Sequence, residues 1–577
     1  MKTLKKYIII SLTVSLLGSC IVDSELTEVP KDFLSPENSF TNKAAFESAL
    51  AEIYRNIRVH LYMNANMSAD YAMLGIDVDL TIYRNVGDAY TANIGQLWFW
   101  NTINRSHATI NQYWGYFYYW IFLANTVIDR AEYDIVKWKT DDEKREIVAE
   151  AKFLRAFAYK FLAHCWGDVP LVLNETTEPK FDYVRAPRQE VYQQMKADLT
   201  EAVQYLKTVD QQAGGRAPRA AAYHLLSEVN ICLGDYAGAI AAASAVINDP
   251  NFYLMTERFG VRKNFTFNGY SYQGPQRPWG DVYWDLFHKG NMQWKEGNHE
   301  AIWNIEMHQT ILGGLNAGTA GEGLFGMERH WTPSPWLHTD KNGLSNFLKD
   351  TLYGRPIGSL AATEYTGDLI WRYKDDWNRD IRNSEFNIQR EHYWLNPASV
   401  FYGQLMLPEH MGVLAEYERA VAPSYKKCVE AVHYGTRIDP TSGQKNDGGC
   451  IIKDWYIMRM SETYLLRAEA KFRSGDLQGA ADDINVVRGR AKATPVTATD
   501  VNIDLILDER ARELFAEEFR LATLMRMGKL VEYLHKYNTA VLRNNYQIPS
   551  YKNLFPIPHN AIEANKYADL GQNEGYE

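Results

Sequence analysis

The fold is decided by the stretch Ile457-Met458-Arg459-Met460-Ser461-Glu462-Thr463-Tyr464-Leu465-Leu466-Arg467-Ala468-Glu469-Ala470, followed by Gly475-Asp476. Its apolar residues recur at intervals of three and four, which is the spacing of an amphipathic helix. Gly475 supplies a left-handed helix end and Asp476 the next N-cap, and a second apolar face follows at Ala480, Ala481, Ile484 and Val487. We predict that 455–529 forms two paired helices, a break and one more long helix. Such a pair cannot bury its apolar stripe alone, so it predicts a helical-repeat scaffold.

The same pattern occurs once earlier in the chain. Ala220–Leu233 has helical spacing, Gly234-Asp235 is a turn, and Ala239–Ile247 is a returning helix. Two interpretations remain open: tetratricopeptide-like pairs, which we favour, and unrelated helical hairpins that use the same turn chemistry.

The first twenty residues resemble an export signal. Lys2, Lys5 and Lys6 precede an apolar run, Tyr7–Leu17, that is too short to span a bilayer. The run ends in Leu17-Gly18-Ser19-Cys20, which resembles a bacterial lipobox; the alternative is an ordinary signal peptide with a chance cysteine. We expect residues 1–19 to be removed, Cys20 to carry the lipid, and residues 20–34 to tether the chain to a membrane.

Length and composition limit the function. The chain has 577 residues and a net charge of −10, which makes nucleic acid an unfavourable partner. Aromatic residues make up 13%, with 37 Tyr and 16 Trp. This content fits an aromatic helical core or a surface that stacks on flat ligands, and composition does not separate the two.

The remaining cysteines do not form a metal-binding pattern. Cys165 and Cys232 lie in helical patterns, where a small buried side chain is the simplest interpretation. Cys428 and Cys450 flank a turn-rich segment of an exported chain, so a disulfide between them is one alternative. No CxxC motif or Cys/His cluster indicates zinc.

The chain divides into two helical blocks around an irregular region. Residues 35–250 form a helical, tetratricopeptide-like N-terminal block, and 448–577 form a C-terminal helical block with an extended tail. Between them, 251–447 is rich in Gly, Pro, Asn and Trp and contains only short strand-like runs such as Ala301–Met307. We predict a mainly α protein with an irregular, ligand-binding lobe at 251–447.

Five groups of residues, in the right order behind the lipobox, resemble the SusD/RagB family of outer-membrane glycan-binding lipoproteins. They are Phe40, Phe46 and Ala49-Leu50 to Tyr54; Glu150-Ala151-Lys152-Phe153-Leu154-Arg155-Ala156-Phe157 with Gly167-Asp168-Val169-Pro170-Leu171-Val172; Arg459–Ala470; Glu509-Arg510-Ala511-Arg512-Glu513-Leu514 with Phe519-Arg520; and Phe555-Pro556-Ile557-Pro558 with Gln572-Asn573-Glu574-Gly575-Tyr576. The chain departs from the family pattern at Glu518, where Gly is frequent, and at Glu574, where Pro is common.

The resemblance implies a function as well as a fold. It implies a tetratricopeptide-like scaffold, a lipid-anchored location on the cell surface, and a TonB-dependent outer-membrane transporter as the partner. The lipoprotein would capture a glycan oligosaccharide and the transporter would import it. The resemblance implies neither catalysis nor a cofactor.

The ligand-binding candidates follow from sugar chemistry. Sugar rings have apolar C–H faces and polar rims, so binders combine aromatic platforms with amide or carboxylate side chains. Family members place a stacking aromatic near Trp98, Trp100 and Asn101, and further platforms in the irregular lobe. The candidates are Trp98, Trp100, Asn101, Tyr83, Trp279, Tyr283, Trp284, Trp331 and Trp336.

Enzymatic and metal signals are weak. His299-Glu300 does not continue as HExxH, and Glu300 and Glu306 lie on a strand-like run. Asp375, Asp376 and Asp380 lack the EF-hand spacing, although a structural calcium stays open. Two alternatives to glycan capture remain: a peptide-capturing member of the same family, and an all-α glycoside hydrolase, which requires an acid and a base across a cleft.

Overall fold

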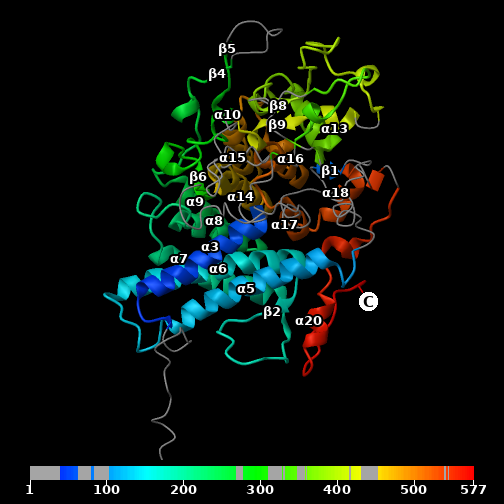
Figure 1. The fold of residues 1–577 in the computed structure, drawn as a ribbon. Helices are drawn as coiled ribbons and strands as arrows, with labels where there is room; N and C mark the ends of the chain where they lie inside the picture. The colour runs from blue at the N-terminus through cyan, green and yellow to red at the C-terminus, as the bar shows by residue number, and fades with distance from the viewer. Residues whose placement is uncertain are drawn as a thin grey trace, which may run out of the picture.

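The computed structural model of the chain describes residues 39–62, 80–82, 103–267, 277–308, 328, 332–346, 356, 358, 360–414, 417–430, 453–538, 541–542 and 545–576. Within this part, the molecule is a stack of helices that carries a lobe of short elements (Figure 1). No helix among these residues combines the length and the apolarity that crossing a membrane requires.

The described part of the N-terminal block contains six helices: α3 (Lys43–Tyr62), α5 (Ala108–Arg130), α6 (Asp141–Trp166), α7 (Arg188–Tyr205), α8 (Arg219–Cys232) and α9 (Tyr236–Ile247). Local sequence fixes their ends. The Thr140 side chain accepts a hydrogen bond from the backbone N–H of Glu143 and caps α6, which ends at Gly167 with a φ of +80°. Consecutive helices pack on one another, and α3, α5 and α6 run side by side across the lower half of Figure 1.

The C-terminal block contains α14 (Met460–Arg473), α15 (Leu477–Arg490), α16 (Ile503–Leu514), α17 (Arg520–Arg526), α18 (Leu530–Tyr537) and α20 (His559–Ala564). Its first hairpin repeats the turn of the α8–α9 hairpin. Asp476 Oδ1 accepts from Gly479 N at 2.8 Å, and Asp235 Oδ1 accepts from Gly238 N at 2.9 Å. Helix α14 packs on both α8 and α9, so the two hairpins form one continuous stack. The predicted helical-pair scaffold is therefore confirmed.

Two details of the predicted C-terminal block are wrong. Trp455–Arg459 is not the start of a helix but a strand, β10, which pairs antiparallel with β6 (Ala301–Ile305). All five residues of each strand are buried, so an apolar run that fits one face of a helix is here covered on both faces. The single long helix is two helices, because Ala516 adopts a φ of +63° between α16 and α17.

The lobe between the blocks contains only short elements in its described part, as the sequence predicts. Its strands pair in the combinations β1–β7, β4–β5 and β8–β9, and a further pair, β2–β3, lies at the end of α6. The strands are β1 (Leu80–Ile82), β2 (Val169–Pro170), β3 (Arg185–Ala186), β4 (Thr266–Phe267), β5 (Arg277–Pro278), β7 (Leu360–Ala362), β8 (Ile388–Gln389) and β9 (Ser424–Tyr425), and the α-helices are α10 (Val282–Asp285), α12 (Glu364–Gly367) and α13 (Tyr417–Val421).

Buried ion pairs join the lobe to the C-terminal helices. The Arg459 guanidinium lies 2.6 Å from Glu300 Oε2, and Arg490 lies 2.9 Å from Glu300 Oε1. Glu509 on α16 forms ion pairs with Arg382 and Arg488, each at 2.8 Å. Burial alone would raise the pKa of Glu509, but the surrounding guanidinium charges lower it to about 2. The Glu509–Glu513 motif of the sequence is thus a structural one.

Candidate functional site

Several predicted ligand-binding residues lie outside the described part of the chain. These are Tyr83, Trp98, Trp100, Asn101 and Trp331, together with the side chain of Trp336; the predicted lipid-attachment residue, Cys20, also lies outside it. Their roles stay predictions.

Three predicted platforms in the lobe are buried, so the expectation that they present open rings is wrong. Trp279 is 5% exposed and packs between Phe267 and Phe386, with ring centroids 5.4 and 5.1 Å away. Tyr283 and Trp284 are each 2% exposed, and the Tyr283 hydroxyl donates to the backbone of α16. Gly280 permits this packing, because a Cβ there would lie 2.5 Å from the Trp284 ring. The Gly- and Pro-rich sequence indicated a loop, but this loop folds onto its own aromatic residues.

The structure describes Cys428, for which a disulfide was one alternative, and two of the carboxylates considered for a structural calcium. Cys428 is a free, buried thiol, so the suggested disulfide is not formed; Cys450 lies outside the described residues. The Asp376 carboxylate pairs with Arg488, and Asp380 pairs with Arg382 at 2.6 Å. These two carboxylates are thus neutralised by arginine.

The first candidate site is an open groove along α3, which we call the α3 groove. Its volume is about 630 Å³, and α3, the turn 214–216 and the end of β6 line it. Its floor is aromatic but closed: Trp303 is 2% exposed and stands edge-on to Tyr54. Its sides carry acidic and basic side chains, namely Glu47, Glu52, Arg55, Arg58, Arg216 and Glu306, and the imidazole of His308.

A buried carboxylate holds the floor of the α3 groove in place. Glu150 on α6 is fully buried; it accepts from the Tyr54 hydroxyl at 2.6 Å and from Arg216 Nε at 2.7 Å. Burial opposes the charge on Arg216, but the hydrogen bonds and charge of Glu150 raise its pKa above the ordinary value. Burial and the nearby Asp454 raise the pKa of Glu306, whose carboxylate lies against Gly214. The groove therefore presents hydrogen-bonding groups fixed by an ion pair beneath them.

The α3 groove lies beside two points at which the chain leaves the described residues. Residues 63–79 follow directly on α3, and residues 309–327 follow on the end of β6. Arg58 Nη1, near the C-terminal end of α3, donates to the backbone oxygen of Glu306 at 3.1 Å. His60 stacks on Tyr116 at 3.6 Å, which places the start of α5 beside the same end of α3. The C-terminal ends of α3 and of β6 thus lie near one another.

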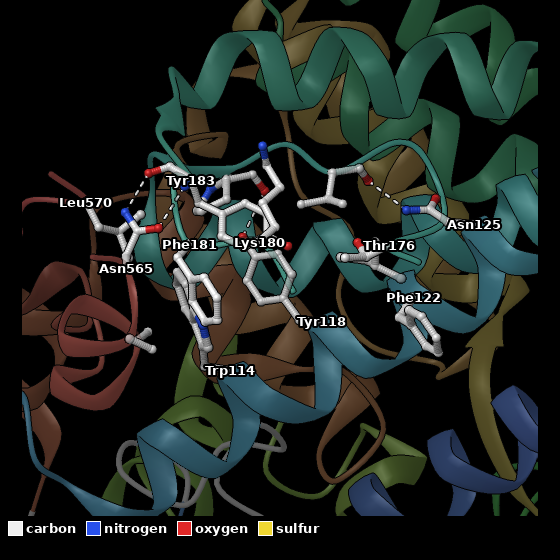
Figure 2. Close-up of a pocket in the computed structure, with 15 residues that line it drawn as sticks. Trp114, Tyr118, Phe122, Asn125, Thr176, Lys180, Phe181, Tyr183, Asn565 and Leu570 are labelled. Carbon is white, nitrogen blue, oxygen red and sulfur yellow. Dashed lines mark hydrogen bonds between the residues drawn. The ribbon is translucent and has the colours of Figure 1, made fainter. Parts of the chain in front are cut away.

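The second candidate site is an aromatic pocket of about 390 Å³, which we call the α5 pocket (Figure 2). Trp114, Tyr118 and Phe122 rise from successive turns of α5, and Phe181 comes from the loop 171–184 between β2 and β3. Residues 561–570, in and after α20, close one side. Residues four apart lie on one face of a helix, so the four-residue spacing of these three aromatic residues in the sequence indicates that they share a face of α5. That spacing by itself predicts only a helix, not a pocket.

Three polar side chains around the α5 pocket form hydrogen bonds with backbone groups of its wall. Asn125 Nδ2 donates to the carbonyls of Val172 and Asn174 at 3.0 and 3.1 Å. The Tyr118 hydroxyl donates to the Pro170 carbonyl at 2.8 Å, and burial raises the pKa of that hydroxyl. Asn565 holds the backbone of Tyr183 by bonds of 2.7 and 2.8 Å (Figure 2). These groups shape the pocket and leave its walls apolar.

The carboxylate pair considered for hydrolysis does not face a cleft. Glu300 is fully buried and bonded to Arg459 and Arg490, whereas Glu306 opens into the α3 groove. A glycosidase needs both carboxyl groups to reach the same substrate. Glu300 and Glu306 therefore do not form such a pair.

Two family profiles match the chain. Residues 373–576 match the SusD family, and residues 32–231 match a family described as starch-binding and associating with the outer membrane. SusD-like protein P25 of Formosa agariphila is 22% identical over 592 aligned residues, covering 96% of each chain. The starch-binding protein SusD of Bacteroides thetaiotaomicron is 39% identical over 122 residues, covering 21% of each chain.

Solved structures share the fold over nearly the whole length. A laminarin-binding SusD-like protein matches with a TM-score of 0.65 and 20% identity, covering 93% of this chain and 100% of that one. Surface glycan-binding protein A of Bacteroides thetaiotaomicron, in complex with laminarihexaose, matches with a TM-score of 0.64 and 20% identity, covering 92% and 100%. The profile matches at both ends, the relatives and the shared fold agree: the chain belongs to the SusD/RagB family.

Proposed function

We propose that this protein is a lipid-anchored, cell-surface lipoprotein that captures glycan oligosaccharides and delivers them to a TonB-dependent outer-membrane transporter. The observation that carries the proposal is the α3 groove itself. It is open, and the buried Glu150 beneath it holds Tyr54 and Arg216 in place. The family membership, the starch- and laminarin-binding relatives and the lipobox at Cys20 support the same conclusion.

In this proposal the two parts of a sugar-binding site come from different segments. The α3 groove supplies carboxylate and guanidinium groups for the polar rim of the sugar. Trp98, Trp100, Trp331 and the neighbouring candidates Tyr83, Asn101 and Trp336 supply stacking faces and an amide. Stacking of C–H groups on an aromatic ring adds contact area, while hydrogen bonds fix orientation.

The test is retention of the full-length, detergent-solubilised protein in native gels that contain laminarin or starch. We expect Trp98→Ala, Trp100→Ala or Trp331→Ala to weaken retention at least fivefold, and Glu47→Ala, at the groove edge, to weaken it less. Tyr253→Ala is the control, since Tyr253 is a half-exposed ring stacked on His299 outside the groove. Unchanged retention in all three Trp variants would show that the aromatic assignment is wrong.

The two alternatives give different results in the same assay. The α3 groove carries charges of both signs, which also suits the termini and side chains of a peptide. A peptide-capturing protein would bind neither glycan but would bind peptides from an oligopeptide mixture. A glycoside hydrolase would release new reducing ends from laminarin or starch during incubation, which a capture protein does not.

A further inference from the structure

The α5 pocket is apolar in a way that sugar chemistry does not require. The amides of Asn125 and Asn565 and the hydroxyl of Tyr118 are already bonded to backbone groups of the pocket wall. A sugar placed there would lose water from its hydroxyls and gain few partners, which is unfavourable. A large apolar side chain loses nothing in the same place and gains contact with the rings of α5. The pocket therefore fits an apolar anchor.

Exposed apolar side chains surround the opening. Phe122 is 40% exposed, Phe181 is 38% exposed, and Tyr567, which stands edge-on to Phe181, is 78% exposed. Aromatic residues around a pocket that receives one anchoring side chain are typical of protein–protein interfaces. A bilayer surface is a poorer occupant, because binding to anionic lipids needs an excess of basic residues. Here the exposed acidic residues outnumber the basic ones: Glu178, Asp182, Glu563 and Asp569 against Lys180 and Lys566.

The chain leaves the described structure beside this pocket on its way to the membrane anchor. Arg130, at the end of α5, donates to the hydroxyl of Ser39, near the first described residues, at 3.3 Å. The same guanidinium donates to Glu175 at 2.9 Å, and Thr176 lines the pocket. Residues 20–38 span at most about 65 Å when fully extended. A chain anchored at Cys20 therefore keeps the α5 pocket within reach of proteins in that membrane.

We propose that the α5 pocket receives a large apolar side chain from an extracellular loop of the membrane-embedded transporter and so docks the lipoprotein on it. This inference rests on the proposed function, because it takes the anchor and the transporter from it. It assigns partner docking to the α5 pocket and ligand capture to the α3 groove.

The test uses the full-length lipoprotein in cells, with the photo-crosslinker p-benzoylphenylalanine in place of Phe122 or Phe181. Leu477 on α15, 39% exposed, is the control position. We expect crosslinks to a TonB-dependent barrel, identified by mass spectrometry, from the two pocket positions and not from Leu477. In parallel, Phe122→Asp and Phe181→Asp should lower the amount of that barrel that co-purifies in detergent at least tenfold, whereas Leu477→Asp should not.

Other outcomes overturn the inference. Crosslinks only to lipid or to a second copy of the chain, equal crosslinking from Leu477, or full co-purification of Phe122→Asp would each do so. Loss of laminarin or starch retention in Phe122→Asp would assign the pocket to the glycan instead. If the unsubstituted protein and the two Asp variants co-purify with the same amount of barrel, only the assignment of docking to the α5 pocket fails. If it co-purifies with no barrel at all, the proposed delivery function fails as well.

Discussion

The α3 groove and the α5 pocket are built from neighbouring helices but hold their shape by different means. A buried carboxylate, Glu150, fixes the groove from below, and charged side chains line its sides. Neutral amides, Asn125 and Asn565, fix the walls of the pocket, and aromatic rings line it. Charged groups at the edge of an open groove suit a hydrated ligand that exchanges water for hydrogen bonds, whereas aromatic rings suit an apolar group. The difference supports two separate tasks for the two surfaces.

The largest effect is expected from Glu150→Ala in the floor of the α3 groove. The substitution leaves Arg216 without its buried partner and removes the acceptor of Tyr54. Loss of one member of a buried ion pair costs about 3–5 kcal/mol of unfolding free energy. Urea denaturation measures it, with Glu178→Ala, an exposed residue beside the pocket, as the control. A loss below about 1 kcal/mol would mean that water compensates the charge and that the groove is not held by this pair.

A smaller effect is expected from Asn565→Ala at the α5 pocket. The amide makes hydrogen bonds to the backbone of Tyr183 and Ala568, all between uncharged groups. Leaving such buried groups unpaired costs about 1–3 kcal/mol. Urea denaturation of this variant beside Glu150→Ala compares the two kinds of support directly. A larger loss from Asn565→Ala would reverse the comparison.

Glu306→Gln tests the charge of the α3 groove through pH. Burial, with Asp454 as the second cause, raises the pKa of Glu306 above its ordinary value near 4.5. The folded protein thus holds this proton more tightly than the unfolded chain does. The resulting stability is fully present below pH 4.5 and is lost as the pH rises through the folded pKa. The glutamine does not titrate, so the variant should gain stability relative to the unsubstituted protein as the pH rises above 4.5.

The size of that gain is expected to stay below about 1 kcal/mol, since Glu306 keeps contact with water. Thermal unfolding at several pH values measures it, and Glu178→Gln serves as the exposed control. A difference between variant and unsubstituted protein that does not change with pH would mean that Glu306 titrates alike in both states.

The smallest effect on stability is expected from Phe122→Ala at the rim of the α5 pocket. Its ring is 40% exposed, and substitutions at such positions usually change the unfolding free energy by about 0.5 kcal/mol or less. Phe117, buried one turn earlier on α5, is the comparison: Phe117→Ala should cost about 3–5 kcal/mol. If Phe122→Ala destabilised the protein as strongly as Phe117→Ala, the ring would serve the core and not a partner.

Local sequence determined most of the scaffold. The helix boundaries at Thr140, Gly167, Asp235 and Asp476 follow from capping chemistry, which acts within a few residues and is therefore visible in a single sequence. The same holds for the irregular lobe, because short spacing between Gly and Pro prevents long helices wherever it occurs.

Only the tertiary structure decided what the aromatic residues and the carboxylates do. Trp279 and Trp284 have the sequence surroundings of exposed loop residues, yet Phe386 packs on Trp279 and Phe265 packs on Trp284. Trp455–Arg459 has helical spacing, yet it is a strand because β6, about 150 residues earlier, pairs with it. The α3 groove brings Tyr54, Glu150, Arg216 and Glu306 together from four separate segments. Burial and pairing depend on neighbours that the chain supplies from a distance, so a residue's own stretch of sequence does not contain them.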